Sequence, residues 1–176
     1  MKIEYVLEGS DFLDLMLFQA SKSEDIERRK KKGWIILTLS SIILTFYFFK
    51  WDNIPMTLYF GAVSILLGAF FPSYFKWKYK RRYTKHINKN FSERFGEKEI
   101  FEINEREIFS KDKFGEGTVN LSEVERVDET QKHFFLKVSN GMYLIIPKDK
   151  IQEPEILGSE FEKLGIDRIQ DLTWEW

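Results

Sequence analysis

Hydrophobic residues are concentrated in two uncharged blocks, residues 34–49 and residues 56–75. As helices, the 16 residues of the first block would span roughly 24 Å and the 20 residues of the second roughly 30 Å, against a bilayer core of about 30 Å. A soluble helix carries a polar stripe, and neither block has one beyond scattered Ser and Thr. The pattern therefore predicts two transmembrane helices. The alternative is a soluble protein whose core is a helical hairpin.

The short connection between the blocks predicts that the two helices form a tight hairpin. Residues 50–55 link them, and six residues suit a turn between antiparallel neighbours. Gly61, Ser64 and Gly68 fall near one helix face, where small side chains let the partner helix approach closely. Pro72 is expected to kink or end the second helix at the level of the lipid headgroups.

Basic residues flank the hairpin on one side only. They number eleven, against Lys50 alone in the connecting loop. The positive-inside rule therefore places both chain termini in the cytoplasm. We expect the first ten of these cations to contact anionic lipid at the membrane surface. In chain order the basic residues are Arg28, Arg29, Lys30, Lys31, Lys32, Lys76, Lys78, Lys80, Arg81, Arg82 and Lys85.

The segments next to the hairpin have their own patterns. Residues 2–7 alternate at first as a short strand does, and Ser10 or Asp11 can cap a helix that follows. A helical stretch over residues 23–32 is expected to run directly into the first block. Residues 76–96 predict a basic extension of the second helix, with Gly96 as its stop.

From residue 99 onward the period changes from helical to strand-like. Asn140-Gly141 predicts a tight hairpin turn, Pro154 opens a helix and Gly165 closes it. The order, antiparallel strands and then one helix over the open end of the sheet, is that of a small pleckstrin-homology-like roll. The predicted strands are residues 99–103, 107–110, 118–121, 124–127, 133–138 and 142–146.

These patterns predict an α+β membrane protein with four parts. An N-terminal strand and helix occupy residues 1–33, and the transmembrane hairpin occupies residues 34–75. A basic juxtamembrane helix follows over residues 76–97. The pleckstrin-homology-like sheet domain takes residues 98–176.

The chain resembles the YcxB-like family of bacterial membrane proteins over nearly its whole length, most clearly in several short segments. They are Lys80 to Tyr83, Val124 to Thr130, His133 to Leu136 and Tyr143 to Lys148, with Leu121 where the family commonly has an aromatic residue. The resemblance implies a pleckstrin-homology-like C-terminal domain. Together with the two apolar blocks and their flanking cations, it predicts a multi-pass protein of the bacterial plasma membrane with both termini cytoplasmic. It carries over no catalytic residue.

The side-chain inventory predicts no catalytic chemistry, cofactor or metal. The chain has no cysteine, which excludes disulfides, thiolate zinc sites and a Cys nucleophile. His86 and His133 are interpreted as polar surface histidines because no metal-ligand spacing surrounds them. We therefore expect a protein that is not an enzyme.

Acidic pairs and one glycine-rich segment receive structural interpretations. The pairs at 123/125, 128/129 and 153/155 are interpreted as solvated carboxylates at strand edges. Residues 114–118 are too short and too acidic for a phosphate-binding loop, and are expected to form a turn.

Charge is distributed unevenly along the chain. Residues 1–96 carry 16 Lys/Arg and 9 Asp/Glu, net +7, whereas residues 97–176 carry 11 and 19, net −8. An acidic domain is repelled by anionic lipid, so it is expected to face a protein partner, or to dock on the basic stretches of its own chain. Nucleic acid is disfavoured because the basic patch lies at the bilayer.

Trp174 and Trp176 close the printed sequence and predict a docking peptide for a partner, with packing against the chain's own sheet as the alternative. The function expected is a membrane-anchored interaction or regulatory module of unidentified pathway, with self-association left open. The alternative is a small oligomeric transport or pore-forming subunit. Its polar candidates within the spans are Ser40, Ser41, Thr45 and Ser64.

Overall fold

The computed structural model describes all 176 residues and divides them into two compact units. One unit combines residues 1–16 with residues 84–176, and the other comprises residues 17–83. We call the first the sheet domain and the second the hairpin unit. Two helices, α1 (Gly9–Lys22) and α3 (Ile54–Asn90), cross the boundary between them.

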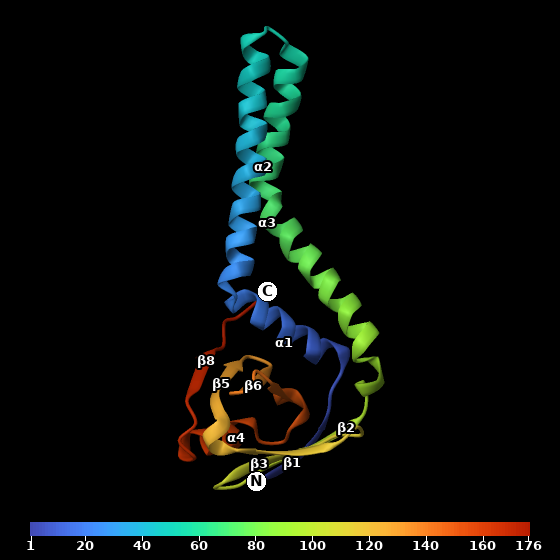
Figure 1. Cartoon of the computed structure of the whole chain (residues 1–176), viewed down its shortest axis with the longest axis vertical. Coiled ribbons are helices and arrows are strands. Elements are labelled where there is room, and N and C mark those ends of the chain that lie inside the picture. The colour runs from blue at the N-terminus through green and yellow to red at the C-terminus, as the bar shows by residue number, and fades with distance from the viewer. The chain divides into compact units, whose positions relative to one another are not determined.

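The elements follow one another in a simple order (Figure 1). The helices are α1 (Gly9–Lys22), α2 (Glu24–Lys50), α3 (Ile54–Asn90) and α4 (Pro154–Lys163). The first four strands are β1 (Lys2–Val6), β2 (Lys98–Ile103), β3 (Glu107–Lys111) and β4 (Glu116–Asn120). The other four are β5 (Val124–Thr130), β6 (His133–Val138), β7 (Tyr143–Pro147) and β8 (Arg168–Asp171).

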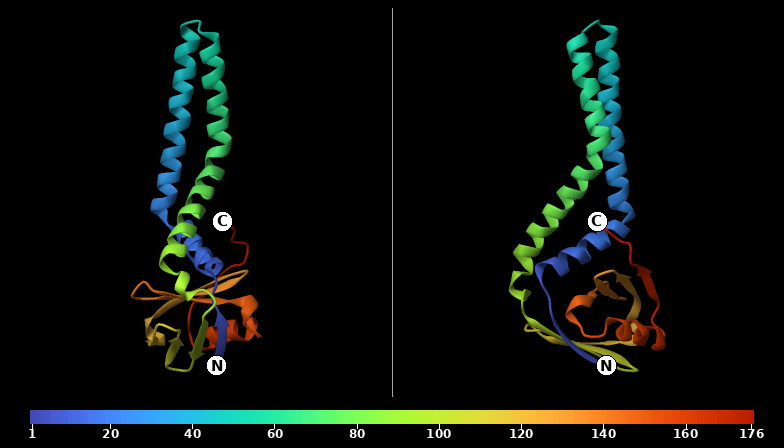
Figure 2. Two further views of the ribbon diagram at one scale, coloured as in Figure 1. Left: turned by 90° about the vertical axis from the view of Figure 1, so that its right-hand side faces the viewer. Right: turned by 180° about the vertical axis from the view of Figure 1, so that it is seen from behind.

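The two long helices of the hairpin unit extend through the basic stretches, as predicted, although α3 ends at Asn90 and not at Gly96. The Ser23 side chain caps α2 by accepting the main-chain N–H of Ile26 at 3.4 Å. The turn between α2 and α3 uses Asp52 in the left-handed region, with φ 52°. Helix α3 continues through Pro72 to Asn90. Of the two outcomes expected at Pro72, a kink or an end, the end does not occur, and α3 instead bends away from α2 in its second half (Figures 1 and 2).

Both helices are long and apolar enough to cross a membrane, judged by length and composition. Their apolar side chains are exposed on most sides, and those of Phe49 and Ile65 are 67% and 73% exposed. In the hydrophobic stretch of α3 no residue is buried, and in that of α2 only 6% are. A core helix of a soluble protein would bury such a stretch, because exposed apolar surface of this extent is unfavourable in water.

Ser64 and Gly61 lie at the contact between α2 and α3, as predicted, together with the stacked rings of Phe48 and Phe60. The hydroxyl of Ser64 donates to the Ser41 hydroxyl at 2.9 Å. The indole N–H of Trp34 donates to the main-chain oxygen of Gly68 at 3.2 Å. A Cβ atom at Gly61 would lie 3.8 Å from Thr45 Cγ2, which is ordinary van der Waals contact.

The first sheet of the sheet domain has the antiparallel order β1-β2-β3-β4. Strand β1 pairs with β2, with Tyr5 opposite Glu99, although α1, α2 and α3 lie between the two strands in the sequence. The N-terminal strand thus belongs to the same sheet as residues 98–120, whereas the sequence analysis placed residues 1–33 in a separate part.

The second sheet has the order β7-β6-β5-β8. Strands β5, β6 and β7 are antiparallel neighbours, and β8 pairs with β5 in parallel after the α4 crossover. Strand β8 was not predicted, because its four residues show no apolar alternation. The Asn140-Gly141 hairpin is confirmed, but only Gly141 has a positive φ, 85°. Asn140 instead accepts the Met142 N–H through its side chain.

The apolar core of the sheet domain lies between its strands and α4. Leu157 and Phe161 are fully buried on the predicted face of α4, and the Phe161 ring meets Phe134 edge-on with centroids 5.7 Å apart. Burying an aliphatic or aromatic side chain of this kind stabilises the fold by roughly 1.5–3 kcal/mol. The largest buried side chains of the two sheets are Phe101, Ile103, Ile108, Phe134, Phe135, Leu136 and Ile146.

Candidate binding pocket in the sheet domain

Side chains on the inner face of the first sheet become smaller toward β4. The register places Phe101 of β2 opposite Ser110 of β3, and Ser110 opposite Gly117 of β4. Phe101 is buried, whereas Gly117 has no side chain to cover the core. The core is therefore left open beside β4.

The next row of paired residues along the first sheet carries polar side chains into the same region. Tyr5 of β1 lies opposite Glu99 of β2. The turn between β3 and β4 closes with a hydrogen bond from the Asp112 N–H to the Gly115 carbonyl at 2.9 Å. Asp112 also accepts the N–H groups of Phe114 and Gly115 through its side chain, both at 2.8 Å. The predicted turn is thus confirmed, although it begins at Asp112 and β4 starts within residues 114–118.

The result is a pocket of about 650 Å³ that lies entirely in the sheet domain. Its apolar wall comes from residues far apart in the sequence, at the start of α1, just after α3 and along β4 and β7. Its polar lining includes Arg94, Glu99 and Asp112. The apolar residues are Leu7, Phe12, Phe91, Phe114, Val119, Met142, Leu144 and Ile145.

Glu99 is the most strongly perturbed carboxyl group of this pocket. Burial, together with the nearby Asp112 carboxylate, raises the pKa of Glu99 to about 7, against the opposing effects of Arg94 and of a hydrogen bond from Tyr5. Burial and the neighbouring Glu99 raise the pKa of Tyr5 well above its usual value. Because Glu99 changes charge near neutral pH, a cationic group of a ligand would stabilise its ionised form.

Arg94 lies at the same end of the pocket as Asp112 and Glu99. Its guanidinium lies 5.4 Å from the centre of the Phe114 ring and 3.7 Å from the Asp112 carboxylate. Phe114 is half exposed at the entrance. The sequence analysis missed this site. The available signal was the alternation of Gly115 and Gly117 at the start of a strand, where glycine often marks close approach by a ligand or another backbone.

His133 is not a surface histidine, and the interpretation made from the sequence is wrong. It is 3% exposed, and its Nε2 atom lies 2.9 Å from Asp11 Oδ1. Lys150 donates to Asp11 Oδ2 at 2.8 Å, and the Glu8 N–H donates to the same oxygen at 2.8 Å. The sequence pattern did not predict this contact, because the partners come from the start of α1, from β6 and from the turn after β7.

Asp128 and Glu129 are also buried, at 4% and 2% exposure, which corrects their interpretation as solvated carboxylates. Glu129 accepts hydrogen bonds from Lys148, from Arg168 at 2.6 Å and from Gln170 at 3.1 Å. Burial opposes ionisation of Glu129, but the hydrogen bonds from Arg168 and Lys148 hold its pKa below the usual value. The carboxyl pairs at 123/125 and 153/155 are exposed, as expected. No group of three His, Asp or Glu side chains is placed to hold a metal ion.

The structure places the predicted lipid-contacting cations on two helices of the hairpin unit. Arg28 to Lys32 lie on the second and third turns of α2, and Lys76 to Arg82 lie on the second half of α3. All are exposed except Lys30, which is half-buried. Arg81 lies over the Trp77 ring at 5.4 Å, and Arg28 pairs with Glu24 at 3.0 Å.

The remaining predicted site residues lie outside the pocket. Trp174 and Trp176 are half-buried after β8, and the Trp174 N–H donates to the Asp171 carbonyl at 3.1 Å. Their role in docking stays a prediction. His86 is exposed on α3, where its Nδ1 lies 3.0 Å from the Asn90 amide nitrogen.

These features define an α+β protein that joins a two-sheet domain to a hairpin of two long apolar helices. A family model described as YcxB-like protein matches residues 103–158, from the end of β2 into α4. The expected resemblance is confirmed over this segment, which includes residues 124–130, 133–136 and 143–148 but not residues 80–83. No curated protein and no solved structure matches the chain significantly.

Proposed function

We propose that this chain is a membrane-anchored interaction module of a bacterial plasma membrane. The hairpin of α2 and α3 spans the bilayer twice, and the sheet domain binds a protein partner in the cytoplasm. The observation that carries the proposal is the contrast between the two units. The sheet domain buries Phe134, Leu136 and Phe161, whereas the hairpin unit exposes Phe46, Leu58 and Ile65 by more than half.

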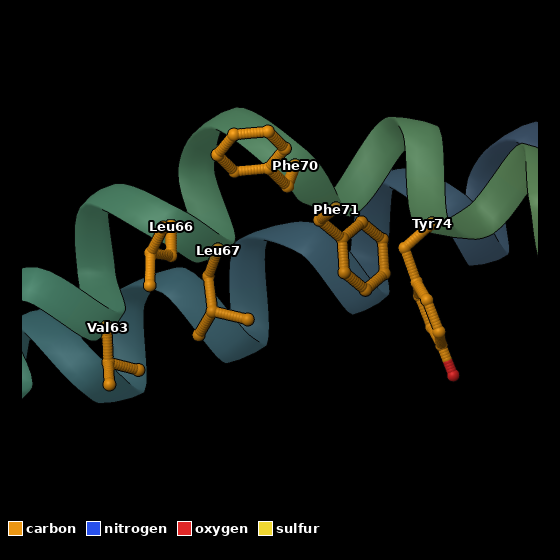
Figure 3. A pocket seen from close by; sticks show the side chains of 6 residues that line it. All are labelled: Val63, Leu66, Leu67, Phe70, Phe71 and Tyr74. Atoms are coloured by element: carbon orange, nitrogen blue, oxygen red, sulfur yellow. The ribbon is translucent and has the colours of Figure 1, made fainter.

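A surface groove on the hairpin unit supports a lipid environment. It has a volume of about 350 Å³, and its walls carry almost no polar surface (Figure 3). Acyl chains of the bilayer would fill such a groove, because its alternative contact is water. Its lining residues, all on α3, are Val63, Leu66, Leu67, Phe70, Phe71 and Tyr74.

The charges at the ends of the hairpin support its proposed orientation. Eleven Lys and Arg residues flank the apolar stretches on the side of the chain termini, and Lys50 is the one cation at the turn. Cations of this kind remain on the cytoplasmic side during insertion. Each contributes about 1 kcal/mol of attraction when it lies close to anionic lipid.

The order of elements supports a pleckstrin-homology-like architecture for the sheet domain. Four antiparallel strands are followed by three more and then by a helix that covers the core. On this interpretation the whole hairpin is an insertion between the first strand and the second. Strand β8 is an addition after the closing helix.

Binding, rather than transport, is the activity that the side chains favour. The alternative of a pore-forming subunit relied on Ser64 and other hydroxyl groups in the spans. Ser64 is hydrogen-bonded to Ser41 and to the Phe60 carbonyl, and Thr45 to the Ser41 carbonyl. The Ser41–Ser64 bond joins α2 to α3 and the other two lie within one helix, so these hydroxyls already have partners inside the hairpin instead of lining a pathway.

Fractionation and topology mapping together test the proposed anchoring. The full chain should sediment with membranes at high salt and at high pH, and detergent alone should release it. A reporter active only in the cytoplasm should work when it is fused after Trp176 and fail when it is inserted at Asn53. Recovery of the intact chain in the soluble fraction, or a reversed reporter pattern, would refute the proposal.

A further inference from the structure

The pocket lies between two strand edges without partner strands. Strand β4 pairs only with β3 and ends the first sheet, while β7 pairs only with β6 and ends the second. Both strands line the pocket, β4 through Gly117 and Val119, and β7 through Leu144 and Ile145. An unpaired edge presents a row of N–H and C=O groups to which another extended chain can pair.

The β3–β4 register shows which main-chain groups of β4 are free. Hydrogen bonds close the ladder at Asp112 with Gly115 and at Arg106 with Leu121. Hydrogen-bonded and non-bonded pairs alternate in an antiparallel ladder, so Thr118 belongs to a non-bonded pair. Its N–H and C=O therefore point away from β3, toward the position of a fifth strand.

Glycines at this edge keep the pocket open. Neither Gly115 nor Gly117 has a positive φ, and a Cβ atom on either would meet nothing within 4 Å. Their presence is therefore explained neither by backbone conformation nor by crowding. Glycine in a strand costs roughly 0.5–1 kcal/mol relative to Ala. Space for an incoming chain is a benefit that would offset this cost.

Charge around the opening favours a basic occupant. Glu99 and Asp112 face the pocket beside a single guanidinium, that of Arg94, and Lys111 is paired with Glu116 at 2.8 Å. The segment from residue 97 onward carries a net charge of −8. A second copy of the same edge would bring the carboxylates of Glu116 and Asp112 close to the same carboxylates of the other copy. Because like charges repel, a partner of different sequence fits better.

We infer that β4 accepts an extended segment of a partner protein as a fifth strand of the first sheet. Alternate apolar side chains of that segment enter the pocket beside Gly117, and a Lys or Arg side chain pairs with Glu99. Recognition by strand addition takes affinity from main-chain hydrogen bonds and specificity from pockets for alternate side chains. The inference rests on the proposed function, because it names the surface through which the module would bind its partner.

The test uses the full chain in detergent micelles and an array of synthetic peptides of about six residues, the usual strand length. The peptides alternate Val or Ile with Thr and carry Lys at each position in turn. A matched array carries Glu in place of Lys. We expect the wild-type protein to bind a subset of the Lys peptides, and binding to weaken roughly tenfold or more, about 1.4 kcal/mol, when Lys becomes Glu.

Two substitutions locate the binding surface. Gly117→Leu fills the pocket, and we expect it to weaken peptide binding at least roughly tenfold while the melting temperature stays constant or rises. Thr118→Pro removes an outward N–H without removing a ladder bond, and should weaken binding similarly. Thr118→Val keeps that N–H and is the matched control. Bound peptide should also slow hydrogen exchange at the Thr118 amide.

Three results would overturn the inference: no peptide binds, Gly117→Leu binds as well as wild type, or the edge is occupied by a second copy of the chain. The last would appear as a dimer in detergent that Gly117→Leu dissociates. The peptide assay does not depend on where the protein resides in the cell. Its failure is therefore distinguishable from failure of the fractionation experiment, which tests the anchor.

Discussion

The Nε2 atom of His133 lies 2.9 Å from Oδ1 of Asp11, although the two residues are 122 positions apart in the chain. Both side chains are almost fully buried. The other carboxylate oxygen of Asp11 accepts hydrogen bonds from Lys150 and from the Glu8 N–H. One carboxylate therefore joins the first turn of α1 to the second sheet.

We predict that Asp11→Ala destabilises the sheet domain by about 3–5 kcal/mol, because it leaves Lys150 and His133 without their buried partner. Thermal unfolding of the full chain in detergent would measure the loss. Glu8→Ala is a suitable control, since its carboxylate is exposed and lies 3.9 Å from Lys150. An exposed pair contributes at most about 1 kcal/mol. Equal losses in the two variants would contradict the assigned role of Asp11.

The same contact predicts a loss of stability in acid. Burial opposes ionisation of Asp11, but hydrogen bonds from His133 and Lys150 hold its pKa below the usual 3.8. The contribution of Asp11 is therefore present above about pH 4 and lost as the pH falls through the folded-state pKa. Unfolding scans below pH 4 should show a steep decline in wild type and a shallower one in Asp11→Asn. Parallel curves would refute the assignment.

Glu99 predicts the opposite dependence on pH. Burial and Asp112 raise its pKa from 4.5 to about 7, so the folded state binds the proton more tightly than the unfolded chain. The resulting stability is present below about pH 4.5 and lost as the pH rises through about 7. Glu99→Gln should flatten this decline and stabilise the protein near pH 8 by on the order of 1–2 kcal/mol.

Glu97→Gln is the matched control for Glu99. Glu97 is half-buried and pairs with the exposed Lys113 at 2.5 Å, so its removal should change the stability by less than about 1 kcal/mol. Thermal unfolding at about pH 5, 6.5 and 8 separates the two variants. A pH profile of Glu99→Gln identical to wild type would show that Glu99 ionises normally.

Most elements of the fold were predictable from periodicity and turn residues. The apolar blocks identified α2 and α3, and Pro154, Leu157 and Phe161 identified α4 and its buried face. Strand β8 was missed because pairing with β5 decides its structure, while its own residues have no strand pattern. Pro72 did not end α3, which continues to Asn90.

The polar sites were much less predictable than the fold. Asp11, Glu129 and His133 look like ordinary surface residues in the sequence, and their burial depends on partners more than 15 residues away in every case. The pocket depends on the register that places Gly117 beside Ser110 and on β7 ending the other sheet. Such proximity is a property of topology, which local sequence patterns do not encode.

Gly158 of α4 predicts a strong effect from a very small substitution. A Cβ atom at this position would lie 2.8 Å from Arg168 Cζ, too close for the guanidinium to stay where it is. That guanidinium is bound to the buried Glu129 and to Glu162. Gly158→Ala should therefore destabilise the domain by roughly 1–3 kcal/mol, although alanine is normally the better helix residue.

The neighbouring Ser159 offers the control for Gly158. Its side chain is exposed and bonds only to the Glu155 carbonyl of its own helix. Ser159→Ala should change the stability by less than about 0.5 kcal/mol. Thermal unfolding of both variants provides the comparison. If Gly158→Ala were as stable as wild type, Arg168 would have an alternative position that retains the Glu129 pair.

The Ser41–Ser64 hydrogen bond predicts a modest effect within the hairpin unit. The two hydroxyl groups are 2.9 Å apart and connect α2 to α3. Hydrogen bonds between membrane helices contribute about 0.6 kcal/mol on average, because the separated helices also find partners. Ser64→Ala should weaken the hairpin by about that amount. Ser64→Leu should weaken it further, since a large side chain separates two helices that pack through small residues.

Fluorescence energy transfer between dyes placed on the two helices, followed during titration with SDS in mixed micelles, would measure this loss. Ser40→Ala is the matched control, because the Ser40 hydroxyl is exposed and bonds only to the Ile36 carbonyl of its own helix. Its titration midpoint should equal that of wild type. Equal shifts for Ser40→Ala and Ser64→Ala would mean that serine affects each helix separately, and that the contact between α2 and α3 depends on apolar packing and on the Trp34 bond to Gly68.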